Sequence, residues 1–165
     1  MSESARDGAA VSERVAVAFS KLTESAANIN KISNQLAKQV AELEGCLKRI
    51  DVRVACWTTL DKQEEQYESW STSVGYARLK GEWRIAIETR HARDWTDQDD
   101  LEQWAFADAP RHLQAKAIEK LADLVEAMVS ATNAAADRLE KKLAPAETLV
   151  TAVKAAMPKG SAGRR

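Results

Sequence analysis

Apolar residues recur at alternating steps of four and three from Val15 to Ile50, and this repeat constrains the fold more than any other feature. With Val15 placed at heptad position d, only the a-position Ser33 is polar. Such a repeat over five heptads is typical of a coiled-coil helix rather than an ordinary surface helix. A helix over 12–50 would be about 58 Å long, so it must pair with another element along its length. We call the following residues the N-terminal seam: at d, Val15, Leu22, Ile29, Leu36, Leu43 and Ile50; at a, Phe19, Ala26, Ser33, Val40 and Leu47.

A second long helix is predicted over 108–143, because no glycine or proline interrupts the chain between Arg111 and Ala144. Asp108 as an N-cap and Pro110 in the first turn are signals of a helix start. The apolar stripe of this segment is wider than a two-helix seam requires, so we expect at least two neighbours. The candidates are the first helix packed antiparallel, a short helix over 146–157, and a second copy of the chain.

Between the two helical segments the apolar period changes to two, which predicts strands. Residues 52–57 form one predicted strand, and 74–79 and 82–87 form a hairpin around the turn Lys80-Gly81. This register pairs Arg78 with Trp83, Tyr76 with Ile85 and Val74 with Ile87, which gives one apolar and one small, polar face. Residues 101–106 fit either a fourth strand or a helical turn that begins at Asp99.

The sequence therefore predicts an α+β fold: a long antiparallel helical hairpin, coiled-coil-like, with a small three- to four-stranded antiparallel β-meander inserted between the helices. A single domain covers 12–157, and its head is the meander over 51–107. Polar loops are expected over 61–69 and 91–100, and disordered ends over 1–11 and 158–165.

Charge and composition exclude several classes of protein. The chain has 24 basic and 25 acidic residues, which argues against a polyanion binder held by overall charge. Residues 61–108 carry twelve acidic and six basic side chains, so this region should repel nucleic acid and attract basic partners. No apolar run approaches the length of a membrane span, and the N-terminus lacks the pattern of a secretory signal. The two cysteines, Cys46 and Cys56, are compatible with a reducing cytoplasm, where we expect the protein to reside.

Sequence motifs for catalysis are missing. His91 and His112 are the two histidines, and neither stands at metal-ligand spacing from a cysteine or glutamate. No glycine-rich phosphate loop occurs. The acidic residues of 94–102 lack the glycine and distal glutamate of an EF-hand, so a solvated loop is the preferred interpretation. We therefore expect no enzyme activity, no metal and no cofactor.

Tryptophans carry the strongest hint of a binding surface, since all five lie between Trp57 and Trp104. Trp83 and Trp104 are expected to pack the sheet onto helix ends, whereas Trp57, Trp70 and Trp95 are harder to bury together. Tryptophan beside arginine can stack on a nucleotide, another small anion or a partner's side chain. The candidate binding residues are Trp57, Trp70, Trp83, Arg78 and Arg84.

Three functional hypotheses follow from these features. The first is a non-enzymatic homo-oligomer that associates through the N-terminal seam and presents the tryptophan-rich meander to a protein partner. The second is an oligomer that captures a small, nucleotide-like anion. The third, a nucleic-acid-associated accessory protein, is less favoured because the chain has no basic stripe.

Overall fold

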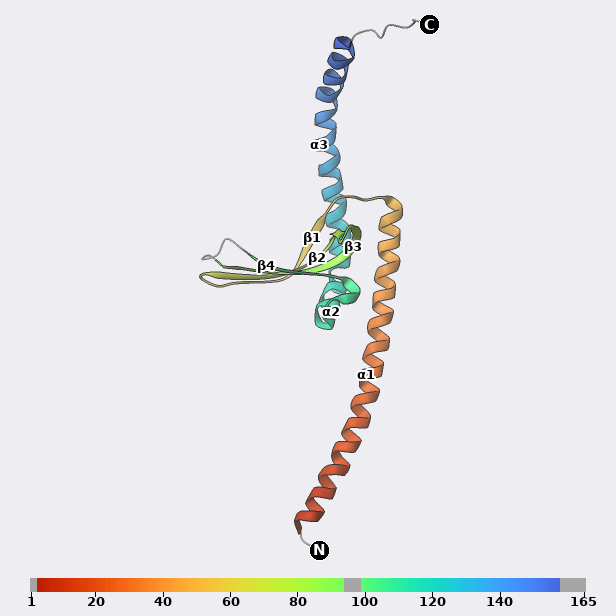
Figure 1. Ribbon diagram of the computed structural model, residues 1–165, viewed down its shortest axis with the longest axis vertical. Coiled ribbons are helices and arrows are strands. Elements are labelled where there is room, and N and C mark those ends of the chain that lie inside the picture. The colour runs from red at the N-terminus through yellow and green to blue at the C-terminus, as the bar shows by residue number, and fades with distance from the viewer. Residues whose placement is uncertain (1–2, 94–98, 158–165) are drawn as a thin grey trace, which may run out of the picture.

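The computed structural model describes residues 3–93 and 99–157, with side chains described from residue 11 onward (Figure 1). The elements in chain order are α1 (Glu3–Ile50), β1 (Cys56–Glu64), β2 (Glu68–Leu79), β3 (Glu82–Arg93), β4 (Asp100–Ala105), a short 3₁₀ turn η1 (Phe106–Asp108), α2 (Arg111–Glu119) and α3 (Leu121–Ala156). The four strands form one antiparallel sheet in the order β1-β2-β3-β4. The predicted α+β class, with a meander between long helices, is confirmed.

The predicted hairpin register is also confirmed. Arg78 pairs with Trp83, and the pairing extends along the whole of β2 and β3, as far as Glu68 with Arg93. Lys80 and Gly81 both adopt positive φ, +49° and +92°, as a two-residue type I′ turn requires. The glycine is suited to this conformation because it has no Cβ.

The strands are longer and placed differently than the sequence analysis expected. β1 begins at Cys56 rather than at residue 52, and it runs through most of the segment assigned to the first polar loop. Residues 91–93 belong to β3 and not to a loop. The segment 101–106 is a strand up to Ala105. Both faces of the sheet's outer half lie away from the helices (Figure 1), so both carry polar residues. The sequence therefore lacks the apolar alternation that would have predicted these strands.

One face of the sheet carries the core. Val74, Tyr76, Ile85 and Ile87 share this face, and all four are buried against side chains from all three helices. The helical contributors are Val40 and Leu47 of α1, Leu113 and Ala117 of α2, and Leu124 and Met128 of α3. The core therefore sits where the helices cross the inner half of the sheet.

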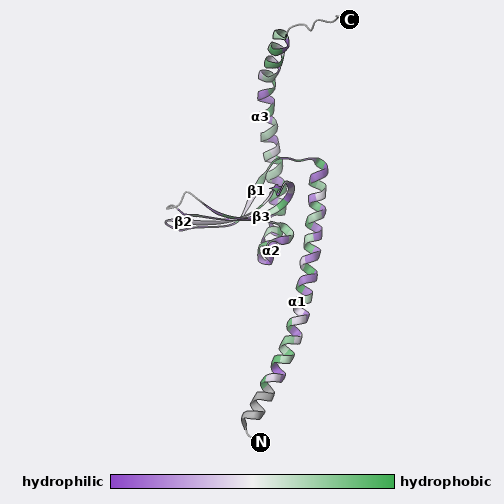
Figure 2. Cartoon of the chain, in the orientation of Figure 1, coloured by the Kyte–Doolittle hydropathy of each residue, from purple (hydrophilic) through white to green (hydrophobic). Residues whose placement is uncertain are grey.

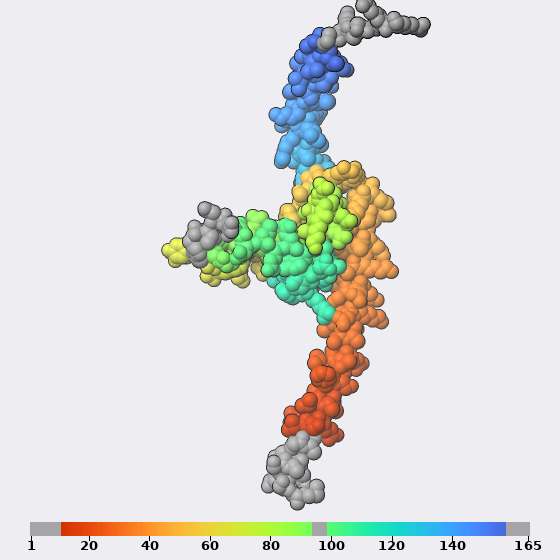
Figure 3. Space-filling view, in the orientation of Figure 1, coloured from red at the N-terminus to blue at the C-terminus, as the bar shows by residue number. Residues whose placement is uncertain are grey.

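The long helices do not form the expected hairpin. α1 projects from the head toward the N-terminus, and α3 projects from the head in the opposite direction (Figures 1 and 3). Each helix packs beside the sheet over part of its length and then continues beyond it. The chain runs the same way along both helices, so they are staggered rather than folded back on one another. Both helices contact the core on the same face of the sheet, each through its own side chains, rather than packing along one another.

The boundaries of the helical segments also needed correction. α1 begins at Glu3, earlier than the predicted start at residue 12 and within the segment 1–11 that was expected to be disordered, while 158–165 lies outside the described residues. The second helix begins at Arg111, and Asp108 belongs to η1 and does not cap it. The predicted helix is divided at Lys120, whose φ and ψ are −108° and 3°, so that α2 ends there and α3 follows. α3 then continues through Pro145 to Ala156. Among the described helices, none has the length and apolar character to cross a membrane.

Candidate functional site

The N-terminal seam divides into a covered and an uncovered half. Val40 and Leu47 are buried in the core, and Leu43 packs against it. Leu36 is half-buried. Toward the N-terminus the same stripe emerges from the head near Asn30, which accepts a hydrogen bond from Arg111 at the start of α2.

Beyond Asn30 the seam is exposed to solvent. The exposed fractions are 47% for Ile29, 62% for Leu22, 67% for Phe19 and 57% for Val15. At the other end of α1, Ile50 is also exposed, because the chain turns away at Asp51, which has φ +58°. The heptad repeat therefore has two parts. The part from Leu36 to Leu47 packs on the chain's own head, and the part from Val15 to Ile29 is exposed in the single chain.

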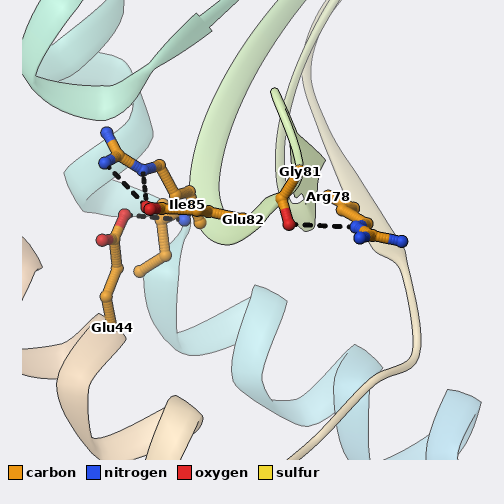
Figure 4. Close-up of polar contacts among 6 residues, drawn as sticks. Glu44, Arg78, Gly81, Glu82 and Ile85 are labelled. Atoms are coloured by element: carbon orange, nitrogen blue, oxygen red, sulfur yellow. Dashed lines mark hydrogen bonds and ion pairs between the residues drawn. The ribbon is translucent and has the colours of Figure 1, made fainter.

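A link between α1 and the sheet holds this arrangement in place. The carboxylate of Glu44 accepts a hydrogen bond of 2.8 Å from the backbone N–H of Ile85 in β3 (Figure 4). Ile85 lies just beyond the end of the β4 ladder, which begins at Ala86, so its N–H has no strand partner on that side. Burial raises the pKa of Glu44, and the hydrogen bond from Ile85 opposes this shift.

Of the predicted binding residues, Trp83 and Arg78 lie beside the same hollow. This hollow, of about 520 Å³, lies at the junction of α1 with the inner end of the sheet, and Lys48, Arg53 and Tyr76 also line it. The Trp83 ring stacks on Tyr76 with 5.4 Å between centroids. Burial raises the pKa of Tyr76, and the charge of Glu44 adds to this shift. Arg78 donates to the carbonyl oxygen of Gly81 at 3.0 Å (Figure 4).

The charges in this hollow leave a surplus of cations. Asp51 pairs with Arg53 at 2.8 Å, and Glu82 pairs with Arg84 at 3.0 Å. Among the described residues, these pairs leave Lys48 and Arg78 without a carboxylate partner within 4 Å. A small anion could therefore approach Trp83 and meet two unpaired positive charges.

The other predicted binding residues are not part of this hollow. Arg84 points to the opposite face of the sheet, because neighbouring residues of a strand alternate between faces. Its guanidinium pairs with Glu82, which lines the hollow, and holds the pKa of Glu82 below its usual value. Trp57 lies on that face as well, with its ring over Gly75, and it is half-buried. Trp95 lies outside the described residues.

Trp70 lies on the outer half of the sheet and stacks on His91, with centroids 4.5 Å apart and planes 14° apart. Arg93 donates to Nδ1 of His91 at 2.9 Å, which leaves Nε2 to donate to Glu68 at 3.0 Å. Arg93 also pairs with Asp100 at 3.0 Å. We call Glu68, Trp70, His91, Arg93 and Asp100 the His91 cluster.

The sequence analysis missed the His91 cluster, because it assigned the outer ends of both strands of the β2–β3 hairpin to the loops 61–69 and 91–100. The signal was nonetheless present in the hairpin register, which brings Trp70 directly opposite His91 when it is continued outward. Trp83 and Trp104, by contrast, pack against the core as expected. The predicted site is thus divided between two faces and two halves of the sheet.

The chemistry of the described residues gives no candidate metal centre, since no three His, Cys, Asp or Glu side chains among them converge to hold an ion. Burial raises the pKa of the Cys56 thiol, which makes it a weaker nucleophile at neutral pH. In comparisons with known proteins, no family model, no curated protein and no solved structure matches the chain.

Proposed function

We propose that this protein is a non-enzymatic, self-associating rod that presents its β-meander head to a protein partner. The observation that carries the proposal is the uncovered half of the N-terminal seam. Val15, Phe19, Leu22 and Ile29 stand at heptad spacing on a helix that extends beyond the head (Figure 3). Apolar side chains that recur in this way favour burial against another helix.

Burial of these four side chains gives a driving force for association. Complete burial of such a side chain is worth about 1.5–3 kcal/mol, and each of these four is about half to two-thirds exposed. Covering them would therefore contribute roughly 3.5–7 kcal/mol per copy, before the entropic cost of association is subtracted.

The flanks of the seam favour a bundle over a two-stranded pair. From residue 11 to 40, the charged residues Glu13, Arg14, Lys21, Glu24, Lys31 and Lys38 all occupy the outward positions b, c and f. Positions e and g hold small, polar or apolar residues, with Val11 and Ile32 exposed at g. Uncharged flanks, with an apolar stripe that widens at Val11 and Ile32, suit a helix with more than one neighbour.

The head supports the partner-binding part of the proposal through its shape and charge. The outer half of the sheet projects away from the helices (Figure 1), so it remains accessible after the helices associate. Its acidic surplus favours a partner with a basic surface and disfavours nucleic acid. The His91 cluster supplies an aromatic and ionic surface of the kind that protein partners use.

Sedimentation equilibrium tests self-association. The wild type is expected to be oligomeric at tens of micromolar, and Leu22→Glu to be strongly shifted toward monomer, because a charge would occupy the seam. Lys31→Glu, at an outward f position, is the matched control and should associate as the wild type does. A wild type that remains monomeric, or a Leu22→Glu variant that associates normally, would contradict the proposal.

A second candidate function is capture of a small anion, which the surplus of cations beside Trp83 favours. Titration with a panel of nucleotides should then quench tryptophan fluorescence, and Arg78→Ala should abolish the response. Arg90→Ala, on the outer half of the sheet and not among the residues of the hollow, is the control. A flat signal from the wild type would leave only the protein-binding proposal.

A further inference from the structure

A second heptad stripe runs along α3, separate from the side chains that join this helix to the head. Its residues follow one another at alternating steps of four and three without a break. We call it the C-terminal seam: at d, Val125, Thr132, Leu139, Ala146 and Val153; at a, Val129, Ala136, Leu143, Val150 and Met157.

The chain's own head covers a different side of α3. Leu124 and Met128 are buried in the core, whereas Val129 on the C-terminal seam is 58% exposed. Farther along, Leu139 and Leu143 are 73% and 57% exposed. This end of α3 is apolar and stands clear of the head (Figures 2 and 3). Since α1 projects in the other direction, it does not cover the C-terminal seam.

Pro145 is compatible with a helix partner on this side. In the heptad numbering of the C-terminal seam it occupies position c, which faces away from a partner at a and d. The helix continues through it to Ala156, and Thr148 donates to the carbonyl oxygen of Ala144 at 2.9 Å beside it. The irregularity that proline introduces therefore lies on the outer surface of α3.

The charges beside the seam indicate the direction of pairing. Lys142 is at g and Glu147 is at e of the following heptad. In a parallel, in-register pair these positions meet across the interface, so Lys142 of each copy lies beside Glu147 of the other. Neither residue has an oppositely charged neighbour three or four positions away on its own helix, so both are available for this contact.

An antiparallel pair over the same span is less favourable. At its centre Glu140 would face Glu140 of the second copy, and Lys142 would face Lys142. Contacts of Glu126 with Lys154 near the two ends would only offset this repulsion. The parallel arrangement has the two Lys142–Glu147 contacts and no opposed like charges at e and g.

We propose that α3 helices of separate copies pair in parallel and in register through the C-terminal seam. This inference rests on the proposed function, because both require self-association, but it adds the second interface and its polarity. Parallel pairing places all heads at one level. Because the chain runs the same way along α1 and α3, the N-terminal seams of all copies then lie together at the end of the assembly opposite the paired C-terminal seams. The assembly is then a polar rod with its heads at one level near its middle.

Charge reversal at the two flanking positions tests this arrangement. Lys142→Glu and Glu147→Lys should each weaken self-association about tenfold, since each replaces two attractive contacts by two repulsive ones. An equimolar mixture of the two variants should regain wild-type affinity as hetero-oligomers, because every contact is again complementary. Lys141→Glu, with the same change of charge at the outward f position, should associate as the wild type does.

The outcomes separate this inference from the proposed function. If the wild type associates but neither charge reversal has an effect and the mixture shows no preference, parallel α3 pairing is overturned and self-association stands. If the wild type is monomeric, both fall.

Spin labels provide a second measurement that does not depend on the charges. A label at Ala155→Cys, in a Cys46→Ala, Cys56→Ala background that still associates, should report intermolecular distances below about 25 Å for parallel helices. Antiparallel overlap centred on residue 141 would separate the two labels by about 40 Å or more, and that result would overturn the inference.

Discussion

Replacing Gly75 with alanine tests whether the Trp57 ring lies directly on the sheet. Gly75 is paired with Trp57 across the first two strands. A Cβ at this position would lie 2.3 Å from Cε3 and 2.4 Å from Cδ2 of the Trp57 ring, and 2.6 Å from the carbonyl oxygen of Cys56. Carbon and oxygen atoms cannot remain at such distances, so the ring and the β1 backbone would both have to move.

The expected cost follows from these contacts. Overpacking a well-packed site costs typically about 1–3 kcal/mol, and the upper end applies here because one of the three obstructing atoms belongs to the backbone. Alanine also lowers the conformational entropy of the unfolded chain, which stabilises the folded state by about 0.4–1 kcal/mol. We therefore expect Gly75→Ala to lower the free energy of unfolding by about 2–2.6 kcal/mol.

Urea unfolding followed by far-UV circular dichroism measures this change, at one fixed protein concentration because self-association contributes to stability. Gly45→Ala is the matched control. A Cβ on Gly45 in α1 meets nothing within 4 Å, so the same substitution should raise the free energy of unfolding by about 0.5–1 kcal/mol.

A double-mutant cycle identifies the obstacle. In a Trp57→Ala background two of the three short contacts disappear, and Gly75→Ala should cost at least about 1 kcal/mol less than in the wild type. Equal costs in both backgrounds, within about 0.5 kcal/mol, would refute the reasoning, as would a Gly75→Ala protein as stable as the wild type.

Two further predictions concern individual carboxylates. Burial raises the pKa of Glu44 above 4.5, so the folded state binds the carboxyl proton more tightly than the unfolded state does. The stability that protonated Glu44 contributes is present below pH 4.5 and is lost as the pH rises through the raised pKa. Glu44→Gln should remove that part of the pH dependence, and unfolding curves parallel to those of the wild type across this interval would contradict it. Asp61 of β1 pairs with Lys116 of α2 at 3.0 Å, and this contact lowers the pKa of Asp61, so its contribution is present above pH 3.8 and lost as the pH falls through the lowered pKa. Asp61→Asn and Lys116→Gln should cause the same small loss of stability at low salt, with no further loss in the double variant and no effect at high salt.

The candidate site was only partly predictable from the sequence. The hairpin register placed Arg78 beside Trp83, because a two-residue turn determines which residues face each other. The same register put Arg84 on the face opposite Trp83, but it did not extend to Trp57, and it could not show which face of the sheet the helices cover. Trp70 was a predicted binding residue, but its contact with His91 was missed, because polar residues on both faces of the outer strands resemble a loop.

What the sequence determined by itself is local: a long first helix from its heptad repeat, a hairpin from Lys80-Gly81 and its alternating flanks, and a helix-rich C-terminal third. Only the tertiary structure decided that the N-terminal seam is buried at Val40 and Leu47 but exposed at Leu22, and that α3 diverges from α1 and continues through Pro145. Periodicity reports which side of a helix avoids water. It does not report what covers that side, because the covering surface is assembled from strands distant in the chain.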